Sequence, residues 1–163
     1  GSEVDTIGDN LLTTYGTSTS HKLPLAVRIG IRDNQSKLTG YLRNIEEATG
    51  VQFRFVVDYE SLYFDEEVPK NQVMNLAHTA INGYLYHFSQ QVVKLCQDER
   101  MKQELITDTS QSKTIELTFG EIDHGYMQTI IYNDGRIVIT TPASKFGSAV
   151  QETGNDLRHY YEL

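Results

Sequence analysis

The sequence predicts an α+β fold: a mixed β-sheet of about five strands, with one short and one long helix packed on one face of it. Three observations lead to this fold class. Apolar and polar residues alternate in several short runs, apolar residues recur at helical spacing in two longer runs, and these runs follow one another in the order β-α-β-α-β-β-β. A length of 163 residues fits one domain, so we expect a single hydrophobic core.

Residues 1–22 differ from the rest of the chain because they are rich in Thr, Ser, Gly and Asp and show no sustained hydrophobic period. We expect them to form a flexible leader. It begins with Gly1-Ser2, which is typical of the scar that an expression tag leaves after protease cleavage. The predicted single α+β domain then covers residues 23–163.

The first half of this domain predicts a strand, a short helix and a second strand. Apolar residues alternate with other residues over 25–31 and again over 51–57, which is the pattern of a strand with one buried face. Between them, apolar residues share one side of a helical wheel from Ser36 to Thr49, and Gly50 is expected to end this helix. A strand, helix and strand in such a short stretch predict a β-α-β unit with parallel strands.

Residues 29–55, IGIRDNQSKLTGYLRNIEEATGVQFRF, resemble the first strand, helix and strand of the short N-terminal signalling domains attached to secretins and TonB-dependent receptors. The matching features are apolar positions and Thr49-Gly50, which almost any β-α-β unit supplies. The long helix expected from residue 71 departs from the second repeat of that family. No functional residue is therefore carried over from it.

The middle of the chain predicts a loop followed by the longest helix. Residues 58–70 carry turn-forming and acidic residues, and we expect a loop there. Helical periodicity then runs from residue 71 to residue 95, with an exposed extension of the same helix to residue 106. The core-facing positions of this helix are Met74, Ala77, Ile81, Leu85, Phe88, Val92 and Leu95.

Three further strands are predicted in the second half of the chain. Apolar residues alternate over 115–119, and residues 126–132 and 136–141 are rich in β-branched and aromatic residues. Asp134-Gly135 separates the last two runs, and this dipeptide between β-rich runs is one of the stronger signals for a hairpin turn.

Charge and cysteine content restrict the partners and the compartment. A net charge of -8 and a pI of about 5.0 repel phosphate backbones and anionic lipid, so we expect neither nucleic-acid nor membrane partners. No apolar run approaches the roughly 20 residues that a bilayer-spanning helix needs. Cys96 is the single cysteine, which excludes an intramolecular disulfide and favours a cytoplasmic location.

The common catalytic motifs are absent from the sequence. It contains no nucleophile elbow, phosphate loop, dinucleotide-binding glycines, zinc-protease motif or EF-hand spacing. We therefore assign no catalytic residue, cofactor or metal ligand, and the balance is against an enzyme. Glu121, Asp123 and His124 form the densest polar cluster, but this composition is that of an ordinary solvated turn.

One candidate binding surface consists of arginines. If the alternation is correct, Arg28, Arg32 and Arg54 project from the face of the sheet that lies opposite the helices. They would form a local positive patch on an acidic protein, suited to an acidic partner. The alternative is that they pair with acidic neighbours such as Glu116, as charged residues on solvated sheet faces usually do.

The other candidate surface consists of aromatic residues in two segments. Tyr59, Tyr63 and Phe64 lie in the acidic loop, and Tyr160 and Tyr161 lie near the end of the chain. Tyrosines combine a large contact area with a polar tip and are enriched in interfaces. The alternative is that both segments fold back and cap the open ends of the core.

These observations favour a non-catalytic protein-interaction or assembly module, with an acidic protein or a second copy of the chain as partner. The alternative is a small ligand-binding domain or enzyme with a pocket between the long helix and the sheet, lined by Tyr84, Tyr86 or His87. A third hypothesis is that the arginine face binds acidic peptides or nucleic acid.

Overall fold

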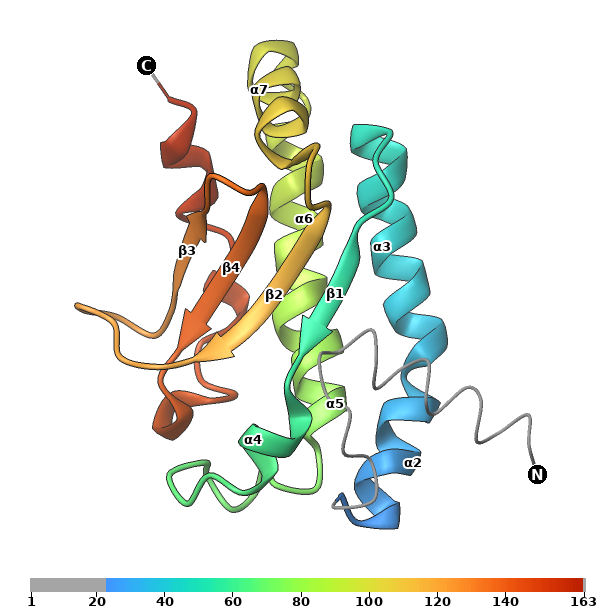
Figure 1. Cartoon of the computed structure of the whole chain (residues 1–163), viewed down its shortest axis with the longest axis vertical. Coiled ribbons are helices and arrows are strands. Elements are labelled where there is room, and N and C mark those ends of the chain that lie inside the picture. Colours follow the sequence, from blue (N-terminus) through green and yellow to red (C-terminus); the bar gives the residue numbers. More distant parts are fainter. Residues whose placement is uncertain (1–22, 163) are drawn as a thin grey trace.

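A computed structural model of the chain describes residues 23–162 (Figure 1), so the expected leader lies outside the described residues. The helices are α2 (Leu25–Asp33), α3 (Gln35–Thr49), α4 (Tyr59–Tyr63), α5 (Leu76–His78), a π-helix (Thr79–Leu85), α6 (Tyr86–Leu95) and α7 (Glu99–Thr109). The strands are β1 (Arg54–Val57), β2 (Thr114–Phe119), β3 (Gln128–Ile131) and β4 (Arg136–Thr141). Three short 3-10 helices follow β4: Ala143–Lys145, Val150–Glu152 and Leu157–Tyr160.

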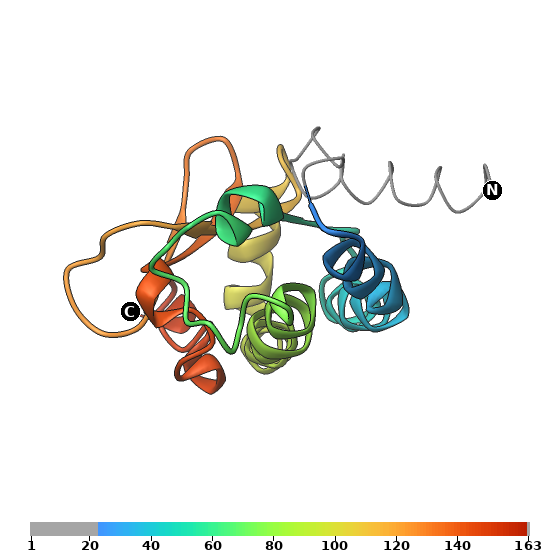
Figure 2. The same cartoon turned by 90° about the horizontal axis from the view of Figure 1, so that it is seen from below.

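The four strands form one mixed sheet in the order β1-β2-β4-β3. β1, β2 and β4 are parallel, and β3 runs antiparallel to β4. Figures 1 and 2 show α3, α5 and α6 together on one side of this sheet. The predicted combination of a mixed sheet and helices is confirmed, whereas the predicted fifth strand is absent among residues 23–162 and the order of elements differs.

The missing strand is the one predicted over residues 25–31, which form α2 instead. Leu23, Val27 and Ile31 are all buried, and their spacing of four residues places them on one side of a helix. Leu25, which the alternation placed with them, is 63% exposed. Residues 25–31 fit both the two-residue period of a strand and the period of about 3.6 residues of a helix. Packing against α5 and α3 selects the helix. The predicted β-α-β unit, and with it the signalling-domain resemblance, is therefore wrong.

Two neighbouring predictions are confirmed. α3 ends where expected, because Gly50 adopts a left-handed conformation with φ of 77° and donates its N–H to the carbonyl of Glu46. The strand expected over residues 51–57 is present as the shorter β1. By contrast, the loop expected over residues 58–70 contains α4, which Asp58 caps by accepting from the N–H of Ser61 at 3.1 Å.

The longest helical stretch runs from residue 76 to residue 95 and forms the centre of the core. Ile81, Leu85 and Phe88 are fully buried, as predicted. Met74 precedes the first turn and is exposed, so its predicted core position is wrong. The π-helix inside this stretch places Asn82 toward α2 and α3, where its amide accepts from the Tyr41 hydroxyl at 2.7 Å and donates to Asn34 at 2.8 Å.

The exposed extension predicted to residue 106 is a separate helix, α7. The chain breaks its helical course after Cys96, and Asp98 starts the new helix by accepting from the N–H of Met101 at 3.0 Å. Met101 and Leu105 turn toward the core, which a straight extension of α6 would not have allowed.

The second half of the sheet agrees with the sequence. β2, β3 and β4 occupy the three predicted segments. The turn between β3 and β4 lies at Asp134-Gly135, and Gly135 adopts a φ of 89°. The C-terminal segment then crosses the outer edge of β3, where Asp156 accepts from the N–H of Thr129 at 2.7 Å and Tyr160 accepts from the N–H of Ile131 at 3.2 Å.

Candidate functional site: the open face of the sheet

The three predicted binding arginines do not share a sheet face. Arg28 and Arg32 lie on α2, and Arg32 pairs with the adjacent Asp33 at 3.5 Å. Arg54 alone lies on the sheet, at the first position of β1. Figure 1 shows α2 beyond the opposite end of that strand. The prediction of one arginine patch is wrong because its geometry depended on a strand that is a helix.

The aromatic residues of the first segment divide between core and surface. Tyr59 is completely buried at the start of α4, and Tyr63 is half-buried. Phe64 is 57% exposed and packs edge-to-face on the Tyr63 ring with 4.9 Å between centroids. The alternative interpretation, that this segment caps one end of the core, therefore holds for Tyr59 and leaves Phe64 as a surface residue.

The C-terminal tyrosines divide in the same way. Tyr161 is buried, and its hydroxyl donates to the Asp108 carboxylate at 2.9 Å. The Arg100 guanidinium donates to the Tyr161 carbonyl, which ties the end of the chain to α7. Tyr160 is exposed, although its hydroxyl accepts from the edge of β3. Tyr161 is thus a core anchor, and of the two only Tyr160 presents its ring to solvent.

The expected pocket between the long helix and the sheet is occupied by packed side chains. Tyr84 is fully buried there, stacks on Phe146 with 5.5 Å between centroids, and accepts from the N–H of Gly147 at 2.9 Å. Burial raises the pKa of the Tyr84 hydroxyl. His87 is half-buried and its Nδ1 lies 2.8 Å from the carbonyl of Gly83.

A groove of about 650 Å³ instead lies on the outer side of the helical layer, between α3 and α6. Ala48 and Ser89 line it together with Tyr86 and Val93, and Glu47 and Lys94 are among its charged residues. This groove contains one of the three residues predicted to line a pocket, Tyr86. No group of three His, Cys, Asp or Glu side chains among residues 23–162 could hold a metal ion.

The opposite face of the sheet is not covered by a helix of residues 23–162 (Figures 1 and 2), but Thr114 and Val138 on it are each only 5% exposed. Its side chains alternate with the core residues along each strand, so that Ile137 and Ile139 join the core cluster whereas Val138, between them, does not. We call this surface the open face, and it comprises Arg54, Val56, Thr114, Glu116, Thr118, Gln128, Ile130, Arg136, Val138 and Thr140.

Strand register arranges the open face in three rows that cross the strands. The first row contains Arg54, Thr114 and Arg136, which are paired across β1, β2 and β4. The second row contains Val56, Glu116, Val138 and Ile130. The third row contains Thr118, Thr140 and Gln128. An apolar centre is therefore flanked by a charged row at one end of the strands and by a neutral polar row at the other.

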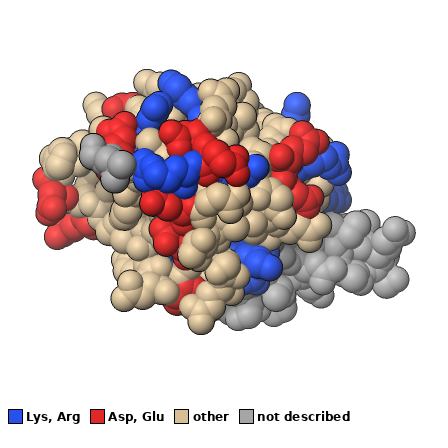
Figure 3. Space-filling view, turned by 90° about the horizontal axis from the view of Figure 1, so that it is seen from above, with Lys and Arg blue, Asp and Glu red and all other residues tan. Residues whose placement is uncertain are grey.

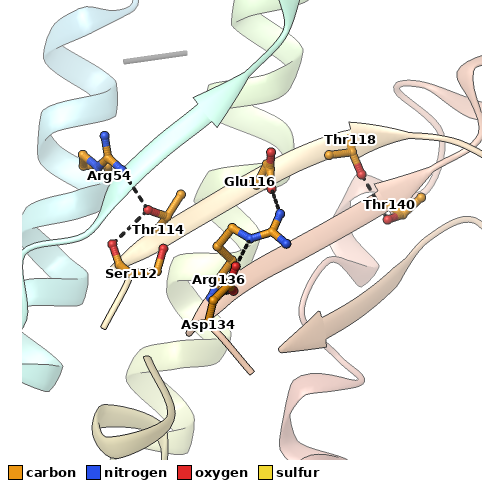
Figure 4. A network of polar contacts seen from close by, with 8 residues as sticks. All are labelled: Arg54, Ser112, Thr114, Glu116, Thr118, Asp134, Arg136 and Thr140. Carbon is orange, nitrogen blue, oxygen red and sulfur yellow. Dashed lines mark hydrogen bonds and ion pairs between the residues drawn. The ribbon is translucent and has the colours of Figure 1, made fainter. Parts of the chain in front are cut away.

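The charged row is held in place by the contacts that Figure 4 shows. The Arg136 guanidinium pairs with Glu116 at 3.0 Å and with Asp134 at 2.8 Å. Hydrogen bonds from Arg136 hold the pKa of the Asp134 carboxyl below its ordinary value. Arg54 donates to the Thr114 hydroxyl at 3.2 Å, and no carboxylate of residues 23–162 pairs with it. Arg54 thus brings a cation to the open face that the described residues do not neutralise.

An aromatic side chain extends the charged row. Tyr132 follows β3, is 44% exposed, and has the Arg136 guanidinium above its ring at 4.9 Å from the centroid. Tyr132 lies outside the two aromatic segments that the sequence indicated as a candidate surface. Alternation places Glu116 and Arg136 on one sheet face, but only the register between β2 and β4 brings them close together.

Figure 3 shows basic and acidic side chains interleaved over one end of the molecule. This mixture agrees with the helical pairs Arg100–Glu104 at 2.9 Å and Arg158–Glu162 at 3.3 Å. Exposed pairs of this kind contribute little to stability, about 0 to 1 kcal/mol each, and they cancel each other's field.

Comparison with protein-family models, with curated proteins and with solved structures finds no match for this chain. No helix among residues 23–162 is long and apolar enough to cross a membrane.

Proposed function

We propose that this chain is a protein-interaction module and that the open face of the sheet is its binding surface. The observation that carries this proposal is the combination of three parallel strands with helices on one side only. Parallel sheets occur almost only where both faces are covered, because their crossover connections place helices on them. Three parallel strands in a mixed sheet with one face free of helices therefore favour a covering layer that a partner supplies.

The chemistry of the open face supports an exchangeable partner. Its central row is apolar except for Glu116, and its outer rows are polar. Interfaces between proteins that also exist separately combine an apolar centre with a polar rim in the same way. Arg54 adds a positive charge that supports an acidic partner, in keeping with the chemistry expected from the sequence.

Lysine substitutions in the neutral polar row test this proposal. Thr118 and Thr140 face each other on β2 and β4 with 3.1 Å between their hydroxyl oxygens, and neither belongs to the core cluster. We expect the pair Thr118→Lys and Thr140→Lys to keep the circular dichroism spectrum and to lose partners in affinity capture with quantitative mass spectrometry, because a partner would have to bury two unpaired cations. The control is the pair Thr107→Lys and Thr39→Lys. It adds the same charge away from the sheet, at exposed threonines of α7 and α3.

The control pair should retain every partner that the parent chain captures. Equal capture by the parent and by the open-face variant would contradict the proposal. Cross-links from a captured protein should also map to β1, β2 or β4, and sedimentation of the chain alone distinguishes a second copy from a different protein as the occupant.

A further inference from the structure

We infer that the element bound by the open face is a single amphipathic α-helix of about 13 residues, with acidic side chains in its C-terminal turn next to Arg54. This inference rests on the proposed function and specifies the partner. The helix would run antiparallel to β1, β2 and β4. Its apolar side would cover the central row and its first turn would contact Thr118 and Thr140.

The size of the open face limits what can bind it. Four strands about 4.8 Å apart, with four to six residues of about 3.3 Å each, give an area on the order of 300 Å². A stable interface between two folded proteins buries about 800 Å² on each partner. A second copy of the sheet placed face to face would thus fall well short of a stable dimer. A helix with a diameter of about 10 Å matches the width of two strands, and about 13 residues at 1.5 Å span their length.

The layering of the fold favours a helix over an extended segment. The other face of the same sheet is covered by helices, so its twist already suits helix packing. The sheet has two edge strands, β1 and β3, and at the outer edge of β3 Asp156 and Tyr160 already accept from the N–H groups of Thr129 and Ile131. A partner strand would need such edge groups, whereas a helix on the face needs none of them.

The charges define the polarity of the bound helix. Arg136 already has two carboxylate partners, whereas Arg54 has none among residues 23–162, so a partner carboxylate gains most beside Arg54. The C-terminal end of a helix carries partial negative charge and is stabilised by nearby cations. Both effects place the C-terminal end of the bound helix at the start of β1. The resulting direction, antiparallel to the strands, is also that of crossover helices in parallel sheets.

Synthetic helical peptides test the inference on the full chain. Three 14-residue peptides share one amphipathic sequence and differ only in their charged residues: two glutamates in the last turn, two glutamates in the first turn, or two lysines in the last turn. Fluorescence anisotropy should show the tightest binding for glutamates in the last turn. Arg54→Glu should weaken that binding at least about tenfold and should improve binding of the lysine peptide, since reversing both charges restores the pair.

Arg43→Glu is the matched control, because Arg43 is exposed on α3 and the variant carries the same charge change away from the sheet. Binding of the first peptide to this control should stay within about twofold of the parent value. Equal weakening by both arginine variants, or equal binding of the two glutamate peptides, would overturn the inference.

A labelling experiment checks that the open face is accessible. In a Cys96→Ser background, Thr118→Cys should react quickly with a bulky maleimide, and the first peptide should slow this reaction. A cysteine that does not react in the isolated chain would mean that the chain covers its own face, which overturns the inference. If no peptide binds but captured partners still depend on Thr118 and Thr140, the inference fails and the proposed function stands. If capture does not depend on them, both fail.

Discussion

Gly135 determines the shape of the β3–β4 hairpin for two separate reasons. Its φ of 89° lies in the left-handed region that side chains with a Cβ avoid. A Cβ at this position would also lie 3.1 Å from the N of Ser112 and 3.2 Å from the carbonyl oxygen of Asp108. These are backbone atoms that cannot rotate away, so the turn is packed against the end of α7.

Comparison of two glycine substitutions separates these causes. Gly135→Ala should cost about 3 kcal/mol of unfolding free energy, from backbone strain together with overpacking. Gly125→Ala, at a φ of 78° with no atom within 4 Å of the added Cβ, should cost only the strain, about 1 kcal/mol. Urea unfolding measures both. Equal costs would show that the neighbouring backbone yields.

Single residues also explain why site prediction from sequence was incomplete. Tyr59 and Phe64 have similar side chains in one short segment, yet one is fully buried and the other is exposed. Tyr59 begins α4, which packs against α5, whereas Phe64 follows the last residue of that helix. Aromatic content therefore does not tell which residues of the segment reach the surface.

At the scale of elements, the break between α6 and α7 depends on a cap that the sequence shows only as a charged run. The Asp98 side chain accepts from the N–H of Met101 and supplies the partner that a new helix start requires. Asp98→Ala should lower the free energy of unfolding by about 1 kcal/mol. Asp98→Asn keeps an accepting oxygen and should melt close to the parent in calorimetry. A full loss in both variants would mean that charge, not capping, is the cause.

Phe88 tests the role of the long helical stretch in the core. Phe88 is fully buried, so Phe88→Ala should lower the free energy of unfolding by about 3 to 5 kcal/mol. Val93, on the same helix but 40% exposed, is the control, and Val93→Ala should cost under about 1 kcal/mol. Both losses of stability are measured from the midpoints of denaturant unfolding, provided that the dependence of the unfolding free energy on denaturant concentration is unchanged. A cost for Phe88→Ala near that of the control would show that α6 contributes little to the core.

Helix and strand predictions succeeded where only one hydrophobic period fits the residues. α3 and the three C-terminal strands are such cases, and Gly50 and Gly135 mark their ends through positive φ. Residues 25–31 fit two periods, and local propensity cannot choose between them. The choice requires a partner surface, which α5 and α3 provide.

At the scale of the whole molecule, the C-terminal segment closes the fold. It caps the outer edge of β3 and ends on α7, where the buried Tyr161 donates to Asp108. Burial, with a smaller effect of Asp108, raises the pKa of the Tyr161 hydroxyl far above its ordinary value of 10.0. Burial likewise raises the pKa of Tyr84.

These raised pKa values predict alkaline destabilisation. Above about pH 10 the unfolded chain releases protons that the folded chain keeps, so stability is full below that pH and falls as the pH rises further. Tyr161→Phe should lower stability at neutral pH by about 1 kcal/mol through the lost hydrogen bond. The stability of this variant should also decrease less steeply than that of the parent as the pH rises above about 10. Thermal melts between about pH 8 and pH 11 measure this. An unchanged slope in Tyr161→Phe would contradict the assignment.

The sequence alone determined the class of the fold, the ends of α3, the three C-terminal strands and their hairpin, because each depends on local period or backbone conformation. Tertiary structure decided which side chains meet. The open face depends on the register between β1, β2 and β4, and Arg54, Thr114 and Arg136 come together there from strands far apart in the chain. Parallel register is a long-range property that no local pattern encodes, so the site became visible only in the folded molecule.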